Sequence, residues 1–325
     1  MPAKNASNYL TTCLDSIVQQ GERHWELLAV DDASTDETWN ILQAYAAKDE
    51  RIRLFRNTEK GIIPALRLAF QNSKGTYITR MDADDKMAKD KLKSLKAALQ
   101  QKGKGYLATG MVEYFSDDTL GQGYQKYAAW LNELCVHNEH FNEVYKECVI
   151  PSPCWMLART DFIQCGAFSS NRYPEDYDLC FRFYAAQLKP LGVPKILHHW
   201  RDHPNRTSRN DERYADNRFL DLKLHYFCQL DHDSSKQLVL WGAGKKGKTI
   251  AQHLGKQQID FRWVCNQSSK WGHRIQGILM EDYTVLQQIQ QVQIIIAVAN
   301  STAQKEIKTF LLDCEIGAAD FFFFC

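Results

Sequence analysis

The sequence predicts an α/β fold in which a mostly parallel sheet is followed by a smaller α/β domain. Three observations predict it. Apolar, β-prone runs alternate with helical patterns along the first hundred residues, two of these runs end in aspartate clusters, and a glycine-rich turn follows a later apolar run. The aspartate clusters stand in LLAVDDASTD (27–36) and YITRMDADD (77–85). Unpaired carboxylates are too costly to desolvate inside a sheet, so we expect them where the strands emerge, at the edge where open α/β sheets bind ligands.

The first hundred residues read as a succession of helices and strands. Residues 9–20 place Leu10, Cys13, Leu14 and Ile17 on one face of an amphipathic helix. The elements expected after it are a strand at 26–30, a helix capped by Ser34 or Thr35 that runs to about Ala47, a strand at 52–55, a helix at 64–73, a strand at 77–81 and a helix near 88–101. This alternation predicts a layered, mostly parallel sheet.

The rest of the chain predicts a second domain. Residues 105–170 are irregular and rich in aromatic side chains, and helices are expected at 176–187 and about 213–230. The polar run at 231–236 is the expected linker, so the predicted domains are 1–230 and 237–325. QLVLWGAGKKG (237–247) begins a new strand–turn–helix unit, and strands are expected at 261–265 and 293–299.

Composition narrows the class of protein. The chain has 325 residues, 44% of them hydrophobic and 24% charged, with a net charge of +1. This balance gives no reason to expect nucleic acid as a partner. No apolar run is long enough for a transmembrane helix and the N-terminus lacks a signal-peptide layout, so we expect a cytoplasmic protein. The ten cysteines have no C-x-x-C pair and are expected to be reduced thiols.

Residues 1–230 resemble a family-2 glycosyltransferase with a GT-A fold. The matching segments, in family order, are MPAKNASNYLTTCLDSIVQQ, WELLAVDDASTDET, SKGTYITRMDADD, SPCWMLART with CGAF, PEDYDLCFRF and HHWRDHPNRTS. The family has an apolar first strand before the segment that reads MPAKN here. That strand is expected to be missing, and a few more residues upstream of Met1 are expected in the native protein.

The resemblance implies an inverting, metal-dependent transferase. It would move a sugar from a UDP- or GDP-type donor to a glycan or lipid-linked acceptor, in synthesis of cell-surface polysaccharide or glycoconjugate. Peripheral contact with the inner face of the membrane is left open. Asp82 and Asp84 resemble the family's DxD and would bind Mg²⁺ or Mn²⁺, hard ions that take oxygen ligands. Asp84 is the expected metal ligand, and Asp82 would hold the metal or the ribose.

The resemblance also implies residues for the nucleotide and for the acceptor. Asp31 and Asp32 would bind the base and ribose, and Ala3 and Asn5 would lie against the base. Arg201 and Arg206 would pair with phosphate oxygens, and His203 would ligate the metal or hydrogen-bond the diphosphate. In the second acidic pair, Asp176 would be the general base for the acceptor hydroxyl. Glu175 would orient that base or bind the acceptor, and Trp155 would stack on a sugar ring.

The C-terminal domain reads as Rossmann-like. Gly242, Gly244 and Gly247 form GxGxxG after a strand and before a helix. An NAD site also needs an acid at the end of the second strand, where this chain has Cys265 and Asn266. The domain resembles the small domain that precedes some sugar acyltransferases, and a structural role, a sugar-nucleotide ligand and redox chemistry stay open. For the whole chain the alternatives are a degenerate transferase acting as a scaffold and an NAD-type oxidoreductase centred on this domain.

Overall fold

The computed structural model describes residues 1–116, 120–204, 206–210 and 219–325. These form two compact units. The first unit comprises residues 1–142 and 148–210, and the second comprises 143–147 and 211–325. The second unit begins at residue 211, before the predicted linker at 231–236. That residues 1–230 and 237–325 fold independently stays a prediction. None of the helices in the described ranges has the length and apolar content needed to cross a bilayer.

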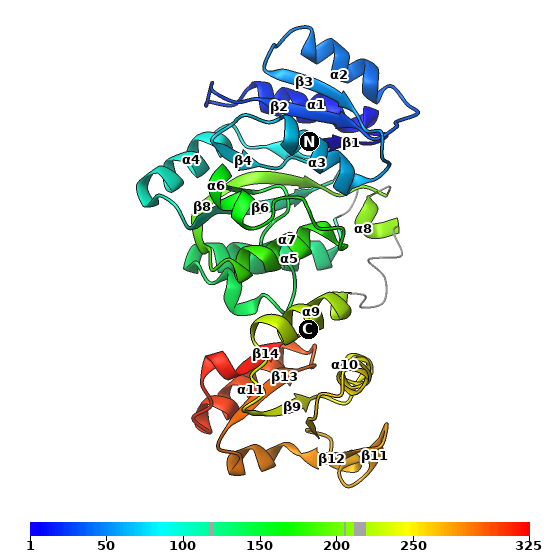
Figure 1. Cartoon of the computed structure of the whole chain (residues 1–325), viewed down its shortest axis with the longest axis vertical. Coiled ribbons are helices and arrows are strands. Elements are labelled where there is room, and N and C mark those ends of the chain that lie inside the picture. The colour runs from blue at the N-terminus through cyan, green and yellow to red at the C-terminus, as the bar shows by residue number, and fades with distance from the viewer. Residues whose placement is uncertain (117–119, 205, 211–218) are drawn as a thin grey trace. The chain divides into compact units, whose positions relative to one another are not determined.

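The first unit alternates strands and helices through its first half and then becomes mixed (Figure 1). Its strands are β1 Pro2–Ala3, β2 Leu27–Asp31, β3 Ile52–Arg56, β4 Tyr77–Thr79, β5 Lys86–Met87, β6 Tyr106–Phe115, β7 Trp155–Ala158 and β8 Lys189–Arg201. Its helices are α1 Ser7–Val18, α2 Thr38–Ala46, α3 Ile62–Asn72, α4 Lys91–Lys102, α5 Gln122–His137, α6 Arg159–Gln164, α7 Glu175–Ala185 and the short α8 Thr207–Asn210, with a 3₁₀ turn at His140–Glu143.

Most of these boundaries lie within a few residues of the predicted ones, but the predicted cap of α2 was wrong. We expected Ser34 or Thr35 to cap this helix, whereas it begins at Thr38. Asp36 takes the capping role, because its carboxylate accepts from the N–H groups of Thr38 and of Ser7, the first residue of α1. These hydrogen bonds lower the pKa of Asp36 to about 2, against the opposing effect of burial.

The strands of the first unit form two sheets. One is a parallel sheet in the order β1-β2-β3, and the other is a mixed sheet in the order β4-β7-β6-β8-β5. The prediction that the first strand is missing was wrong in one respect. Pro2 and Ala3 pair parallel with Val30 and Asp31, and the Met1 amino group donates to the Leu28 carbonyl at 2.8 Å. A short first strand therefore exists, and the expected upstream residues stay a prediction.

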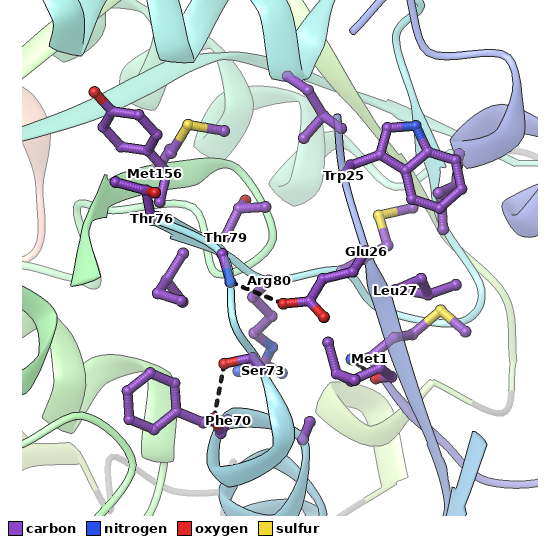
Figure 2. Close-up of a pocket in the computed structure, with 18 of the residues that line it drawn as sticks. Met1, Trp25, Glu26, Leu27, Phe70, Ser73, Thr76, Thr79, Arg80 and Met156 are labelled. Carbon is purple, nitrogen blue, oxygen red and sulfur yellow. Dashed lines mark hydrogen bonds between the residues drawn. The ribbon is translucent and has the colours of Figure 1, made fainter. Parts of the chain in front are cut away.

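A cavity of about 550 Å³ lies in the first unit between β2 and β4. Figure 2 shows its lining, which includes Met1, Leu27, Phe70, Thr79 and Met156. Much of the lining is apolar, while Arg80 reaches one part of it. None of the predicted site residues lines this cavity. The cavity lies between the two sheets and is not the predicted active site.

The second unit contains a single, nearly all-parallel sheet in the order β11-β12-β10-β9-β13-β14. Its strands are β9 Gln237–Trp241, β10 Arg262–Cys265, β11 Arg274–Ile275, β12 Ile278–Asp282, β13 Val292–Ile296 and β14 Phe321–Phe323; its main helices are α9 Phe219–Leu230, α10 Lys245–Lys256 and α11 Ser301–Asp313. Of the helix predicted at 213–230, residues 213–218 lie outside the described ranges. The terminal phenylalanines form the edge strand β14, which pairs parallel with β13, and Phe324 is fully buried.

Candidate active site

The acidic segment Asp82-Ala83-Asp84-Asp85 connects β4 to β5, and its three carboxylates have three different partners. Asp82 Oδ1 accepts from Arg80 Nε at 2.9 Å, Asp84 Oδ2 lies 2.9 Å from His203 Nε2, and Asp85 Oδ2 lies 2.9 Å from His198 Nε2. The side chains of Asp82 and Asp84 keep 25% and 28% of their surface exposed, while that of Asp85 keeps 3%. The two acids of the DxD pattern are thus open to a ligand, and the third is turned inward.

Arg80 joins two predicted parts of the site that lie far apart in the sequence. Its side chain is 5% exposed, and Nη1 donates to Glu175 Oε1 at 2.9 Å while Nε contacts Asp82. Burial opposes a charged guanidinium, but Asp82, Glu175 and Asp176 outweigh it and raise the pKa of Arg80. The sequence analysis did not select Arg80, although a basic residue set among strand-end carboxylates was a signal that could have found it.

Asp84 interacts with residues of the HHWRDHPNR segment, His203 and Arg206. Burial would raise its pKa, but the hydrogen bond from His203 and the charge of Arg206 lower it. His203 Nδ1 and Arg206 Nη1 are buried and have no hydrogen-bond partner among the residues that the structure describes. The predicted phosphate ligand Arg201 instead donates Nε to the Asp84 carbonyl at 3.0 Å, and its guanidinium lies 4.7 Å from the Tyr9 ring centroid. Arg206, rather than Arg201, therefore offers an unsatisfied donor to an anion.

The second acidic pair opens α7. Glu175 is buried; its Oε1 accepts from Arg80, and its Oε2 has no hydrogen-bond partner within the described ranges. Asp176 is partly buried, and its Oδ1 accepts from the Tyr177 N–H at 2.8 Å. Burial and the neighbouring Glu175 raise the pKa of Asp176 to about 7, against the opposing charge of Arg80. A carboxylate with that pKa can hold and release a proton near neutral pH.

The predicted nucleotide-binding residues lie together at the end of β2. The Ala3 carbonyl accepts from the Asp32 N–H at 2.8 Å, and Asn5 Oδ1 accepts from the Thr35 N–H at 2.9 Å. Asp32 Oδ1 accepts from Asn57 Nδ2 at 2.6 Å and from the Gly61 N–H at 2.9 Å. Asp31 accepts from the Ser34 N–H at 3.4 Å. Asp32 therefore already bonds residues of the 57–61 loop, whereas the Asp31 carboxylate accepts a single long hydrogen bond from the described residues.

Trp155 lies in the core. Its side chain is 2% exposed and packs between Phe162 and Phe183, each at a centroid distance of 5.5 Å. A buried ring in an aromatic cluster offers no free face to a sugar, so its position does not favour the predicted stacking role.

The glycine turn of the second unit is packed closely. Gly242 has φ +123°, and a Cβ on Gly247 would lie 2.0 Å from the Gly242 carbonyl oxygen. Trp263 Nε1 donates to that same carbonyl at 2.8 Å. Gly244 has no atom near its would-be Cβ. Two of the three glycines are thus required by the packing of α10 against the turn, whatever the turn binds.

The donor set at the acidic segment suits a hard divalent ion shared with a phosphate. Among the described residues, no group of three or more His, Cys, Asp or Glu side chains is arranged to hold a metal by itself. Mg²⁺ usually takes one or two carboxylates and completes its sphere with substrate phosphates and water. The accessible oxygens of Asp82 and Asp84 fit an ion of that kind.

Comparison with curated proteins finds glycosyltransferases. The chain is 34% identical over 119 residues to the "Putative teichuronic acid biosynthesis glycosyltransferase TuaG" of Bacillus subtilis, which covers 36% of this chain and 47% of the relative. It is 25% identical over 211 residues to GlyG of Streptococcus pneumoniae, covering 62% and 69%. Identity to GlyA of the same strain is 31% over 216 residues, covering 64% of this chain and 31% of the relative. The chain thus spans less than half the length of two of these relatives.

Solved structures share the fold. Staphylococcus aureus TarS in complex with UDP-GlcNAc aligns with TM-score 0.53 and 16% identity over 72% of this chain and 67% of that chain. The mannosyltransferase PcManGT of Pyrobaculum calidifontis, in complex with GDP-Man and Mn²⁺, aligns with TM-score 0.52 and 18% identity, over 78% and 67%. The sequence profile described as "Glycosyl transferase family 2" matches residues 1–166. The chain therefore belongs to glycosyl transferase family 2 and carries that family's GT-A fold.

Proposed function

We propose that this protein is an inverting, metal-dependent glycosyltransferase that uses a UDP- or GDP-type sugar donor. The acceptor is a hydroxyl of a glycan or a lipid-linked sugar, in synthesis of cell-surface polysaccharide or glycoconjugate. The observation that carries the proposal is the Arg80 bridge, because it brings the acids assigned to the donor within one contact of those assigned to the acceptor.

The nucleotide half of the site rests on Asp31, the Ala3–Asn5 loop and the DxD acids. A carboxylate accepts from N–H groups of a base or from ribose hydroxyls. Asp82 and Asp84 would hold Mg²⁺ or Mn²⁺, which supplies charge neutralisation for the leaving diphosphate. The buried Nη1 of Arg206, which has no partner among the described residues, is a donor that a phosphate oxygen would satisfy.

The acceptor half rests on Asp176. Its carboxylate takes the proton of the acceptor hydroxyl while that oxygen forms a bond to the anomeric carbon of the donor. The bond from this carbon to the diphosphate breaks, and the nucleoside diphosphate leaves with the bonding electron pair. Attack from the face opposite the leaving group inverts the anomeric centre. Glu175 is fixed by Arg80, and its second oxygen, which has no partner among the described side chains and backbone groups, would bind the acceptor.

Relatives favour the donor class. TarS was solved with UDP-GlcNAc, PcManGT with GDP-Man and Mn²⁺, and TuaG is named for teichuronic acid biosynthesis. The second unit enters the proposal as a structural or docking part that does not bind NAD, because no acid follows β10 at Cys265 and Asn266. A resemblance of this unit to the small domain of sugar acyltransferases remains part of the proposal.

The test is release of nucleoside diphosphate from UDP-GlcNAc, UDP-glucose, UDP-galactose and GDP-mannose, with Mn²⁺, Mg²⁺ or EDTA. Metal-dependent release from one donor, abolished by EDTA and stimulated by a glycan acceptor, is expected. Tight binding of NADH to the full chain, with no release from any donor, would favour the oxidoreductase alternative. No binding of any nucleotide would favour the scaffold alternative.

A further inference from the structure

The last acid of the acidic segment is built into the protein rather than presented to a ligand. Asp85 has both oxygens occupied: Oδ1 accepts from the Arg201 N–H at 2.8 Å and Oδ2 lies 2.9 Å from His198 Nε2. Its neighbour Asp84 remains accessible. The two adjacent carboxylates thus differ: Asp84 is accessible and Asp85 is anchored in the protein. The groups that hold Asp85 therefore also fix the direction of Asp84.

His198 is held in turn by a buried lysine. Its imidazole is completely buried on β8, and its Nδ1 lies 3.2 Å from Nζ of Lys91, the equally buried first residue of α4. Lys91 also donates to the Pro153 carbonyl. An ammonium group can only donate, so His198 Nδ1 accepts and Nε2 carries the ring proton. That tautomer points an N–H at Asp85, as the 2.9 Å contact requires.

The result is a buried row of Lys91, His198 and Asp85 that ties α4 and β8 to the acidic segment. Arg201 adds a second tie, since its N–H holds Asp85 while its Nε holds the Asp84 carbonyl. A buried row of paired polar side chains contributes little net stability compared with apolar side chains of the same volume. What such a row does supply is a fixed geometry for the groups it holds.

We propose that His198 and Lys91 are positioning residues that hold Asp85 so that Asp84 and Asp82 face the donor diphosphate and its metal ion. This inference rests on the proposed function. It assigns a role to two residues that touch neither the acceptor acids nor the accessible face of the DxD acids.

The experiment is a calorimetric titration of Mn²⁺ into the full chain in the presence of UDP, repeated with GDP. His198→Leu removes both ring nitrogens and is expected to weaken Mn²⁺ binding by about 10–100-fold, the usual range for groups that orient a metal ligand. His198→Gln keeps a side-chain N–H that can reach Asp85 and is expected to recover most of that loss. In turnover assays the loss should appear in the Mn²⁺ concentration for half-maximal rate more than in kcat.

The matched control is His199→Gln. His199 is the next residue on β8, partly exposed and bonded to the exposed Glu113, so this variant should titrate like the wild type. Thermal unfolding shows whether each variant is folded. Should His198→Leu not fold, Asp85→Asn replaces it, because it keeps the acceptor for Arg201 and loses the one for His198.

Each outcome decides a separate point. A folded His198→Leu or Asp85→Asn variant with Mn²⁺ affinity within about twofold of wild type overturns the positioning role, and so does an equal loss in His198→Leu and His198→Gln. If Asp84→Ala also titrates like the wild type, or the wild type binds no Mn²⁺, the metal site of the proposed function fails and the positioning role fails with it. If Mn²⁺ binding depends on Asp84 but is unchanged in His198→Leu, the positioning role is wrong and the proposed function is retained.

Discussion

In each unit a strand ends in a turn with the features of a ligand site, β4 in the acidic segment and β9 in the glycine turn, yet the two turns differ in which polar atoms they leave without a partner. Around the acidic segment of the first unit, buried side-chain atoms of Glu175, His203 and Arg206 have no hydrogen-bond partner in the part of the chain that the structure describes. In residues 237–325, all of which are described, no buried side-chain nitrogen or oxygen is left without one. There Trp263 bonds the Gly242 carbonyl and Lys270 approaches the Ala243 carbonyl at 3.3 Å.

This difference shows that polar residues at the end of a strand are not sufficient to indicate a ligand site. Unsatisfied buried polar groups are costly, and a bound ligand can supply the missing partner. By this criterion the acidic segment has polar atoms that a ligand could pair with, whereas side chains of the second unit already bond the carbonyls of the glycine turn. The predictions below test this contrast.

The largest effect is expected from Asp84→Ala, which should abolish transfer while the fold survives. The substitution removes the accessible carboxylate that would bind the metal, and with it several kcal/mol of leaving-group stabilisation. Nucleoside diphosphate release is the measurement, and Glu113→Ala, an exposed acid on β6, is the control. Unchanged turnover of Asp84→Ala with Mn²⁺ present would contradict the metal assignment.

Asp176→Asn should lower kcat by about 10²–10⁴-fold while donor affinity stays near wild type, because the amide keeps the shape but cannot accept the proton. Steady-state kinetics with titration of the nucleoside diphosphate separates the two quantities. Loss of donor binding would place Asp176 in the nucleotide site instead.

The same residue sets a pH dependence. Burial and Glu175 raise the pKa of Asp176 to about 7, with Arg80 opposing and Asp82 adding to the shift. As a base it must be ionised, so kcat/KM should rise with pH through about 7. For stability the sign is opposite: between pH ~4 and ~7 the folded protein binds more protons here than the unfolded chain, so the free energy of unfolding falls as pH rises through that window. Asp176→Asn should remove this contribution, and denaturant titrations at pH 5 and 8 measure it.

Gly247→Ala should destabilise the protein by about 1–3 kcal/mol, since its Cβ would meet the Gly242 carbonyl oxygen at 2.0 Å. Gly244→Ala is the matched control, because nothing lies near the position of its Cβ. If the glycines served a dinucleotide instead of packing, NADH would bind the wild type at micromolar concentration and the Gly244 variant would lose that binding.

The smallest effect is expected from filling the cavity between β2 and β4. Four or five apolar residues added before Met1 should extend β1 along β2 and raise the melting temperature by a few degrees, about 2–4 °C for each kcal/mol gained. Burial lowers the pKa of the Met1 amino group to about 5, so the present chain loses stability as pH falls from ~8 to ~5. The extension should abolish that loss, whereas a glycine-serine extension of equal length should not raise the melting temperature.

The sequence by itself determined the local elements and the residue types of the site. Periodicity and strand-end acids placed β2, β4, α7 and β9 within a few residues, because amphipathic patterns and the cost of burying charge act over short stretches of chain. The Asp82–Asp84 pattern and the Glu175–Asp176 pair were likewise identifiable, since their chemistry is carried by adjacent residues. The family followed from the order of such segments.

Only the tertiary structure decided which of these groups meet. Arg80 contacts Glu175 across 95 residues, and Asp85 contacts His198 across 113. Lys91 reads in sequence as a surface residue of a lysine-rich helix, and Trp155 as a ring free to stack, yet both are buried. The sequence also did not show that β2 and β4 belong to two separate sheets. Burial and long-range pairing depend on how whole elements pack, and no local pattern in one chain encodes that packing.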